Sequence, residues 1–127
     1  MVEEVGFVTD ESISTLAGVS PDGLSTNSGQ EFKCPSDKVY FEMLMHYSKT
    51  GEVDIQSGYM WQMQMQMLFT GRNTWYFAAF NHNFPQMPIL IAEINADKAK
   101  QQKLREGLVE AVRRYNAAEE TYIKLTA

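Results

Sequence analysis

Short apolar runs separated by polar turns occupy the first third of the chain. One run covers residues 5–8, a second covers residues 13–19, and a third covers residues 30–34. A Ser/Thr/Asn/Gly cluster at residues 25–29 is typical of a turn, and Pro35 ends the third run because proline cannot donate to a central strand pair. The pattern predicts a meander of three short strands.

Two segments in the middle of the chain are candidate helices. Ser36 or Asp37 can cap a helix that runs to about Lys49, and Gly51 ends it. Residues 59–69 alternate Gln and Met, which fits a strand by its period of two. Gln and Met favour helices, however, and the segment holds no β-branched residue. The residues alone leave both structures open, with helix favoured.

The last third of the chain combines two strands with a long helix. Residues 74–80 and 89–94 are apolar runs rich in aromatic or β-branched side chains, and two prolines separate them. Asn95 is a good N-cap for a C-terminal helix, whose apolar stripe consists of Leu104, Leu108, Ala111, Tyr115, Ala118 and Tyr122. The order of elements predicts an α/β (α+β) fold, with a central mixed sheet of about five strands flanked by helices.

Composition narrows the class of protein. The chain has 127 residues, which predicts a single domain over residues 1–127, and its 11 basic and 16 acidic side chains give a net charge of −5. That charge argues against a bulk polyanion binder, but it leaves room for a local basic groove. Cys34 is the one cysteine, so no disulfide forms within the chain, and we expect it to be a small buried residue. No signal peptide or membrane span is recognisable, which predicts a soluble, cytoplasmic protein.

Two carboxylates and a lysine are the best candidates for chemistry. Asp22 stands at a junction between strand and turn, and period two places Glu31 and Lys33 on one face of the following strand. Such a group suits metal-assisted phosphodiester hydrolysis, because hard divalent cations prefer carboxylate oxygens and a bound cation acidifies water. On these three residues alone, the more ordinary explanation is favoured: Asp22 is a turn residue, and Glu31 and Lys33 lie on the solvated face of a strand.

Four motifs in order carry a more specific resemblance. Ser-Pro-Asp-Gly-Leu at residues 20–24, Glu-Phe-Lys-Cys-Pro at 31–35, Tyr-Met-Trp-Gln-Met-Gln at 59–64 and Thr-Trp-Tyr-Phe-Ala at 74–78 resemble the family of phage lambda exonuclease and the YqaJ-type viral recombinases. This family is part of the PD-(D/E)xK nuclease superfamily, with its restriction-endonuclease-like core. The similar stretch extends from about Gly6 into the C-terminal helix. The resemblance also implies that residues 59–69 are helical.

The resemblance implies an activity, its cofactor and its partners. It points to a Mg²⁺- or Mn²⁺-dependent deoxyribonuclease that degrades one strand of duplex DNA from its 5′ end during phage recombination. A ring-shaped homotrimer and a partner single-strand annealing protein are implied as well. Carried over by position, Asp22 and Glu31 resemble the metal ligands, with the backbone carbonyl of Phe32 as a third. Lys33 resembles the catalytic lysine, and Gln62 resembles the glutamine that helps to hold the site.

Two departures from the family's pattern qualify this expectation. Residues 80–83 are Phe-Asn-His-Asn, where the family has an aromatic-Asp-Pro-Arg turn. Nothing in residues 1–18 matches the helical N-terminal portion of the family, which handles the DNA end. We therefore expect a truncated catalytic core that holds DNA weakly. The alternatives are a non-catalytic phage protein on a nuclease scaffold that binds another protein, such as an inhibitor of host defence or a recombination accessory, and one half of a split enzyme.

Two weaker signals have ordinary explanations. His82 lies between two asparagines as in an HNH nuclease, but the further histidines of such a site are missing, so we expect a loop histidine. The lysines and arginines between residues 98 and 114 lie on the long C-terminal helix. We expect them to form a solvated face rather than a DNA-binding surface.

Overall fold

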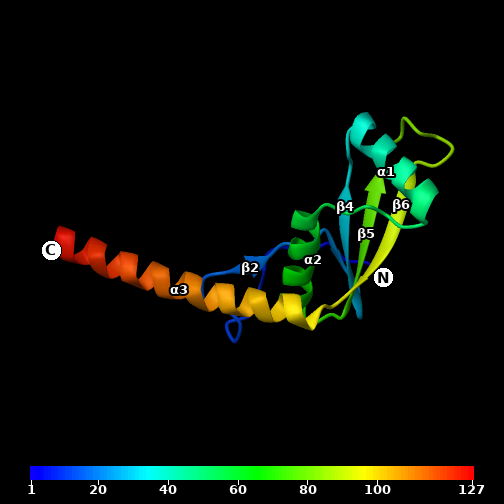
Figure 1. Cartoon of the computed structure of the whole chain (residues 1–127). Helices are drawn as coiled ribbons and strands as arrows, with labels where there is room; N and C mark the ends of the chain where they lie inside the picture. The colour runs from blue at the N-terminus through cyan, green and yellow to red at the C-terminus, as the bar shows by residue number, and fades with distance from the viewer.

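A mixed four-stranded sheet with helices on one face forms the body of the molecule (Figure 1). The computed structural model describes all 127 residues. The sheet has the order β3-β4-β5-β6, formed by Gly23–Leu24, Ser28–Lys33, Thr74–Phe80 and Ile89–Asn95. The β4–β5 pair is parallel, and the two outer pairs are antiparallel. The mixed α/β architecture predicted from the sequence is therefore confirmed, with four strands in the sheet rather than about five.

The first 20 residues form less strand than their apolar runs predict. Val8–Thr9 (β1) and Gly18–Val19 (β2) pair as a separate two-stranded sheet, and Glu3 forms an isolated bridge with Leu24. The Asp10 carboxylate accepts from the backbone N–H of Ser12, and the Asp10 carbonyl accepts from the N–H groups of Ile13 and Ser14. The polar turn predicted at residues 10–12 therefore extends into the first residues of the predicted strand 13–19. The predicted meander of three strands is wrong in a second way. Gly23–Leu24 (β3), which lie outside the three predicted runs, form an edge strand of the main sheet.

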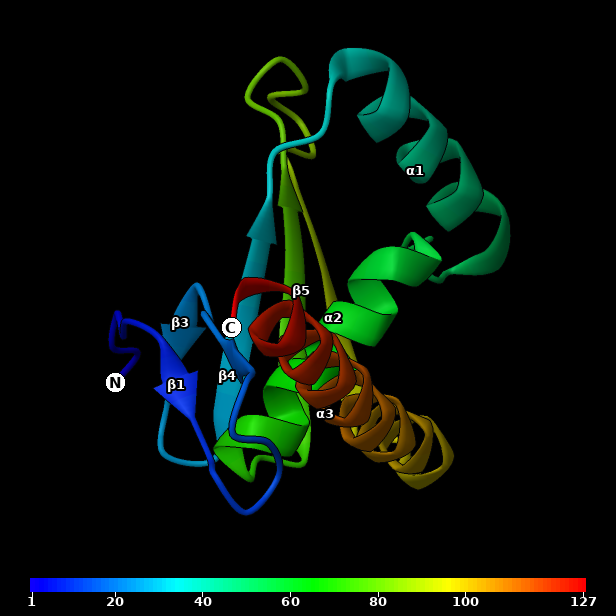
Figure 2. The ribbon, with the colours of Figure 1, turned by 90° about the vertical axis from the view of Figure 1, so that its left-hand side faces the viewer.

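Two helices connect the parallel strands β4 and β5. Helix α1 covers Asp37–Thr50, and the Ser36 hydroxyl caps it by accepting from Val39 N–H at 3.4 Å. Helix α2 covers Ser57–Thr70, so the helical prediction for this segment is confirmed and its alternation of Gln and Met does not make a strand. Each helix ends at a glycine with positive φ, Gly51 and Gly71, a conformation that only glycine adopts at little cost. In Figure 2, α1 lies at one end of the sheet and α3 begins at the other.

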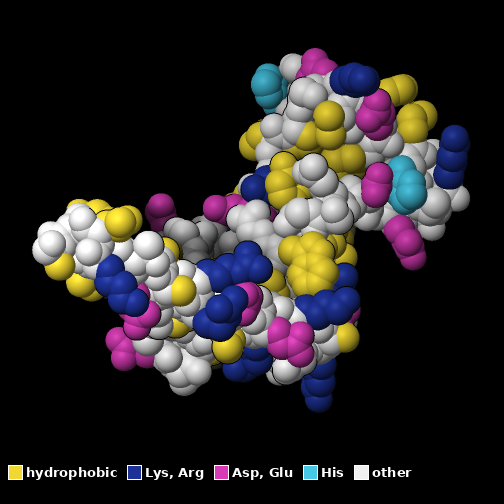
Figure 3. All heavy atoms as spheres, turned by 60° about the vertical axis from the view of Figure 1, so that its left-hand side comes forward, with side chains coloured by type: hydrophobic (Ala, Val, Ile, Leu, Met, Phe, Trp, Pro, Cys, Tyr) yellow, Lys and Arg dark blue, Asp and Glu magenta, His cyan; other side chains and the backbone are white.

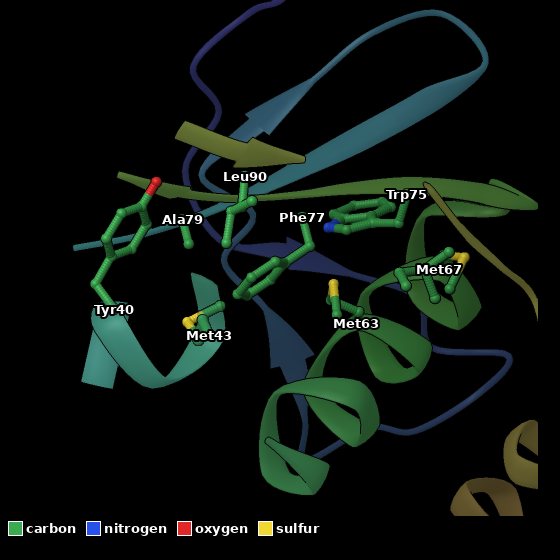
Figure 4. Close-up of a cluster of buried hydrophobic side chains, with 9 residues drawn as sticks. Tyr40, Met43, Met63, Met67, Trp75, Phe77, Ala79 and Leu90 are labelled. Carbon is green, nitrogen blue, oxygen red and sulfur yellow. The ribbon is translucent and has the colours of Figure 1, made fainter. Parts of the chain in front are cut away.

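The hydrophobic core lies between the sheet and helices α1 and α2 (Figure 4). Alternate residues of β5 point into it, as the period of a strand requires. On β4, Gly29 lets the indole of Trp75 lie directly against the backbone, since a Cβ at Gly29 would fall 2.1 Å from the ring. The buried cluster consists of Tyr40, Met43, Met63, Met67, Trp75, Phe77, Ala79, Leu90 and Ile94.

Helix α3, Lys98–Thr126, extends from the body into solvent. Its N-cap is Asp97, not Asn95 as predicted, because β6 continues through Asn95 and the Asp97 carboxylate accepts from Lys100 N–H at 3.1 Å. The buried Gln64 of α2 fastens this end by donating to the Asn95 carbonyl and accepting from Asp97 N–H. Every residue from 113 to 127 is exposed, and Figure 3 shows hydrophobic side chains on the surface at the outer end of α3. No helix of the chain has the length and apolar character needed to cross a membrane.

Candidate functional site

A buried ion pair on strand β4 forms the centre of the candidate site. Glu31 and Lys33 point to the same side of the strand, and Lys33 Nζ lies 3.0 Å from Glu31 Oε1. Only 2% of the Glu31 side chain is exposed, whereas 28% of the Lys33 side chain is exposed. Because a carboxylate is costly to bury without a compensating partner, the ammonium of Lys33 offsets part of the cost of burying Glu31.

A glutamine from α2 holds the other oxygen of Glu31. Gln66 Nε2 donates to Glu31 Oε2 at 3.1 Å, and both side chains are buried. The sequence reasoning assigned this holding role to Gln62, which is exposed and makes no hydrogen bond to the cluster in this structure. Residues four apart share a helix face, and the phase at which α2 packs on the sheet brings Gln66, one turn after Gln62, to Glu31.

Asp22 lies beside the ion pair at the start of β3. Gly23 pairs with Gln30, so the register continued by one residue sets Asp22 opposite Glu31. The Asp22 Oδ2 atom accepts from the backbone N–H of Phe32 at 2.8 Å, which orients this exposed carboxylate. The structure therefore brings together Asp22, Glu31 and Lys33 from two neighbouring strands.

Lys33 is held as a cation. Partial burial pulls the pKa of Lys33 down, but the hydrogen bond and charge of Glu31, together with Tyr59 and Asp22, outweigh burial and raise the pKa above its usual value. The ammonium also lies 4.4 Å from the centroid of the Tyr59 ring, a favourable cation–π distance. In this structure Lys33 is therefore a positive charge beside the Glu31 carboxylate.

A cavity of about 620 Å³ opens beside Lys33, between the end of β4, helix α1 and the start of α2. Its size lies within the usual range for ligand sites. Lys33 and Tyr59 are part of its wall, so a bound molecule has access to the ammonium. Cys34 also lines it and is exposed, which corrects the prediction that this cysteine is buried. The lining residues are Lys33, Cys34, Pro35, Ser36, Val39, Glu42, Met43, Asp54, Gln56, Tyr59 and Phe77.

The donor atoms around Glu31 suit a hard divalent cation. Two carboxylates are present, no histidine or thiolate joins them, and the chain has no group of three or more His, Cys, Asp and Glu side chains placed to hold a metal. Mg²⁺ commonly uses one or two protein carboxylates and keeps several water molecules. Asp22 is exposed, which gives water access to the mouth of the site. A pair of carboxylates with solvent access therefore fits Mg²⁺ or Mn²⁺, and it does not fit a structural zinc site.

The turn between β5 and β6 has a structural role. Asn81 Nδ2 donates to the Pro35 carbonyl and to Asp37, and Asn83 Nδ2 also donates to Asp37, the first residue of α1. The hydrogen bond from Asn83 makes the largest contribution to lowering the pKa of Asp37, and the hydrogen bond from Asn81 makes the next largest. His82 between them is exposed. The Asn-His-Asn sequence thus ties this turn to the start of α1, beside the end of β4.

Comparisons with known proteins point to one family. The profile of the YqaJ-like viral recombinase domain matches residues 1–73. Among solved structures, an alkaline exonuclease (LHK-Exo) from Laribacter hongkongensis superposes with a TM-score of 0.78 at 31% identity. LHK-Exo in complex with dAMP gives a TM-score of 0.76 at 32% identity. Both matches cover 99% of this chain and 62% of the other, so the chain spans less than two thirds of these structures. No curated protein matches the sequence.

Proposed function

The chain belongs to the YqaJ-like viral recombinase domain family, and on this premise we propose that it is the catalytic core of a divalent-metal-dependent deoxyribonuclease of the lambda-exonuclease type. The proposed reaction is hydrolysis of phosphodiester bonds in duplex DNA from the 5′ end, in phage recombination. The observation that carries the proposal is the buried Glu31–Lys33 pair with Asp22 beside it. A solved relative in complex with dAMP supports a nucleotide as the ligand class.

Each residue of the cluster has a proposed role. Asp22 and Glu31, with the backbone carbonyl of Phe32, would hold Mg²⁺ or Mn²⁺. When bound, such an ion acidifies a water molecule and neutralises negative charge on a phosphate. Gln62 lies on the stripe of α2 between Tyr59 and Gln66, and its exposure leaves its amide free for substrate or cation. We therefore propose Gln62 as a further site residue.

Lys33 acts in this proposal as an electrostatic group. Its Nζ lies at the wall of the cavity, where an ammonium would donate hydrogen bonds to phosphate oxygens and stabilise the negative charge that develops there. The Glu31 carboxylate and the Tyr59 ring hold the ammonium from two directions. A fixed donor of this kind needs little reorganisation during the reaction.

DNA binding by this chain alone should be weak. The net charge of −5 opposes association with a polyanion, and Arg113 and Arg114 on α3 are paired with Glu110. The sequence expectation of a solvated basic face on α3 agrees with these ion pairs. We propose a homotrimer and a single-strand annealing protein as the partners that would retain the DNA.

Cleavage of end-labelled duplex DNA by the purified chain, with Mg²⁺ or Mn²⁺, tests the proposal. Lys33→Met should lower the rate at least about 100-fold, the usual effect of losing one preorganised donor. Lys38→Met is the matched control, because the Lys38 side chain is 86% exposed and lies outside the cluster, and its rate should equal that of the wild type. A wild-type chain that cleaves no DNA and binds no Mn²⁺ in calorimetry would contradict the nuclease function.

A second candidate is a non-catalytic protein that acts by binding another protein. The observation in its favour is the exposed apolar face of α3, where the Tyr115 and Tyr122 side chains are 53% and 67% exposed. This function predicts a specific partner in a pull-down that is lost on Tyr115→Ser and Tyr122→Ser but kept on Asp22→Asn. A biological effect that depends on Asp22 would count against it.

A further inference from the structure

The side chain of Gln66 is buried but only half satisfied. It is 2% exposed, and its amide nitrogen donates to Glu31 Oε2 at 3.1 Å. Its amide oxygen is also buried and has no hydrogen-bond partner. The opposite orientation of the amide would set this oxygen against a carboxylate oxygen, so the charge of Glu31 determines which way the amide points. A buried polar atom without a partner is unfavourable for folding.

A neighbouring glutamine shows the contrast. Gln64 of the same helix is equally buried, and both ends of its amide are satisfied by backbone groups, the Asn95 carbonyl at the end of β6 and the N–H of Asp97, the N-cap of α3. Gln64 is therefore explained by the stability of the fold. The side chain of Gln66 donates one hydrogen bond, to Glu31, and its amide oxygen has no partner. The stability of the fold alone therefore does not explain a glutamine at this position.

We propose that Gln66 is a positioning residue that fixes the plane of the Glu31 carboxylate for cation binding. The terminal torsion of a glutamate is broad, so a carboxylate with one partner still rotates. Here Lys33 holds Oε1 and Gln66 holds Oε2, which defines the plane of the group from both sides. Each oxygen keeps a further lone pair for a cation. The inference rests on the proposed function, because it requires Glu31 to be a ligand of Mg²⁺ or Mn²⁺.

Calorimetric titration of the whole chain with Mn²⁺ tests the inference without relying on activity. Gln66→Met keeps the length of the side chain and removes the donor, and it should weaken Mn²⁺ binding about 10-fold or more, as loss of groups that orient metal ligands typically does. Gln64→Met is the matched control, since it removes an equally buried amide from the same helix. It should lower the unfolding midpoint and leave the Mn²⁺ affinity within about 2-fold of wild type, because Gln64 does not touch the cluster.

The outcomes separate this inference from the proposed function. If the wild type binds Mn²⁺ and Gln66→Met binds it equally well, the positioning role is wrong and the nuclease proposal stands. If the wild type binds no Mn²⁺, both are wrong. Gln66→Asn, whose amide is too short to reach Glu31, replaces the methionine variant if that one does not fold, with the same expected loss. In cleavage assays the Mn²⁺ concentration for half-maximal rate should rise about 10-fold in Gln66→Met, with the rate restored at saturating Mn²⁺.

Discussion

Replacing Lys33 by methionine should destabilise the chain more than replacing Glu31 by glutamine, although either change removes the same ion pair. The reason lies in the unequal burial of the partners. Lys33→Met leaves the Glu31 carboxylate, whose side chain is only 2% exposed, without a cationic partner and with Gln66 as its remaining donor. Glu31→Gln leaves an ammonium that is 28% exposed, so water and the Tyr59 ring still solvate it.

The magnitudes follow from these environments. Breaking a buried pair by removing one partner costs about 3–5 kcal/mol, and the hydrogen bond from Gln66 places Lys33→Met at the lower end, about 3 kcal/mol. Glu31→Gln loses one charge-assisted contact to a partly exposed group, which costs about 1 kcal/mol. With a urea m-value near 2 kcal/mol/M, the two unfolding midpoints should differ by about 1 M.

Urea unfolding at neutral pH in the presence of a chelator measures both variants, with tryptophan fluorescence and circular dichroism as independent probes. Lys38→Met should stay within about 0.5 kcal/mol of wild type, because its ion pair with Glu42 is at the surface. A midpoint for Glu31→Gln equal to or below that of Lys33→Met would refute the reasoning, because it would show that the carboxylate is not the partner that needs the pair.

Three further predictions concern the fold. Gly29→Ala should lower the free energy of unfolding by about 1–3 kcal/mol in urea, because its Cβ meets the Trp75 ring. Gly58→Ala should stabilise helix α2 by about 0.5–1 kcal/mol, because its Cβ meets nothing within 4 Å, and equal effects of the two variants would contradict this packing. The lowered pKa of Asp37 contributes stability that is present above its usual pKa of 3.8 and is lost as the pH falls through the pKa of the folded state. The free energy of unfolding of Asp37→Asn should therefore approach that of the wild type as the pH is lowered. A difference that stays constant with pH would argue against this contribution of Asp37. Deleting residues 113–127 should change the free energy of unfolding by no more than about 0.5 kcal/mol in the same urea assay, since these residues are exposed, and a larger loss would mean that they contact the body.

Much of the fold follows from local signals in the sequence. Helix α1 carries its own boundaries, a serine cap and a glycine stop, and β5 and β6 consist of apolar residues with strand propensity. The strand β3 could not be found this way. Its two residues pair only because β4 lies beside them, and such short edge pairing depends on the partner rather than on propensity.

The site was predictable to the extent that it lies on one strand. Period two places Glu31 and Lys33 on one face without knowledge of the fold, and the structure pairs them. The contact of Gln66 with Glu31 depends on the angle and phase at which α2 packs on the sheet. The alternation of Gln and Met in the sequence does not indicate that phase. The spacing of Tyr59, Gln62 and Gln66 by three and four residues predicts that they share one face of a helix. Which of the two glutamines contacts Glu31 depends on burial, because Gln66 is buried and Gln62 is exposed.

The length of α3 has a consequence for hydrodynamic measurements. Its 29 residues span about 44 Å at 1.5 Å per residue, whereas a compact chain of this size has a radius of gyration of about 14 Å. A single copy with this helix extended diffuses more slowly than a sphere of 14.5 kDa and leaves a gel-filtration column early. The number of copies in the particle is therefore best measured by light scattering or sedimentation equilibrium, which report mass independently of shape.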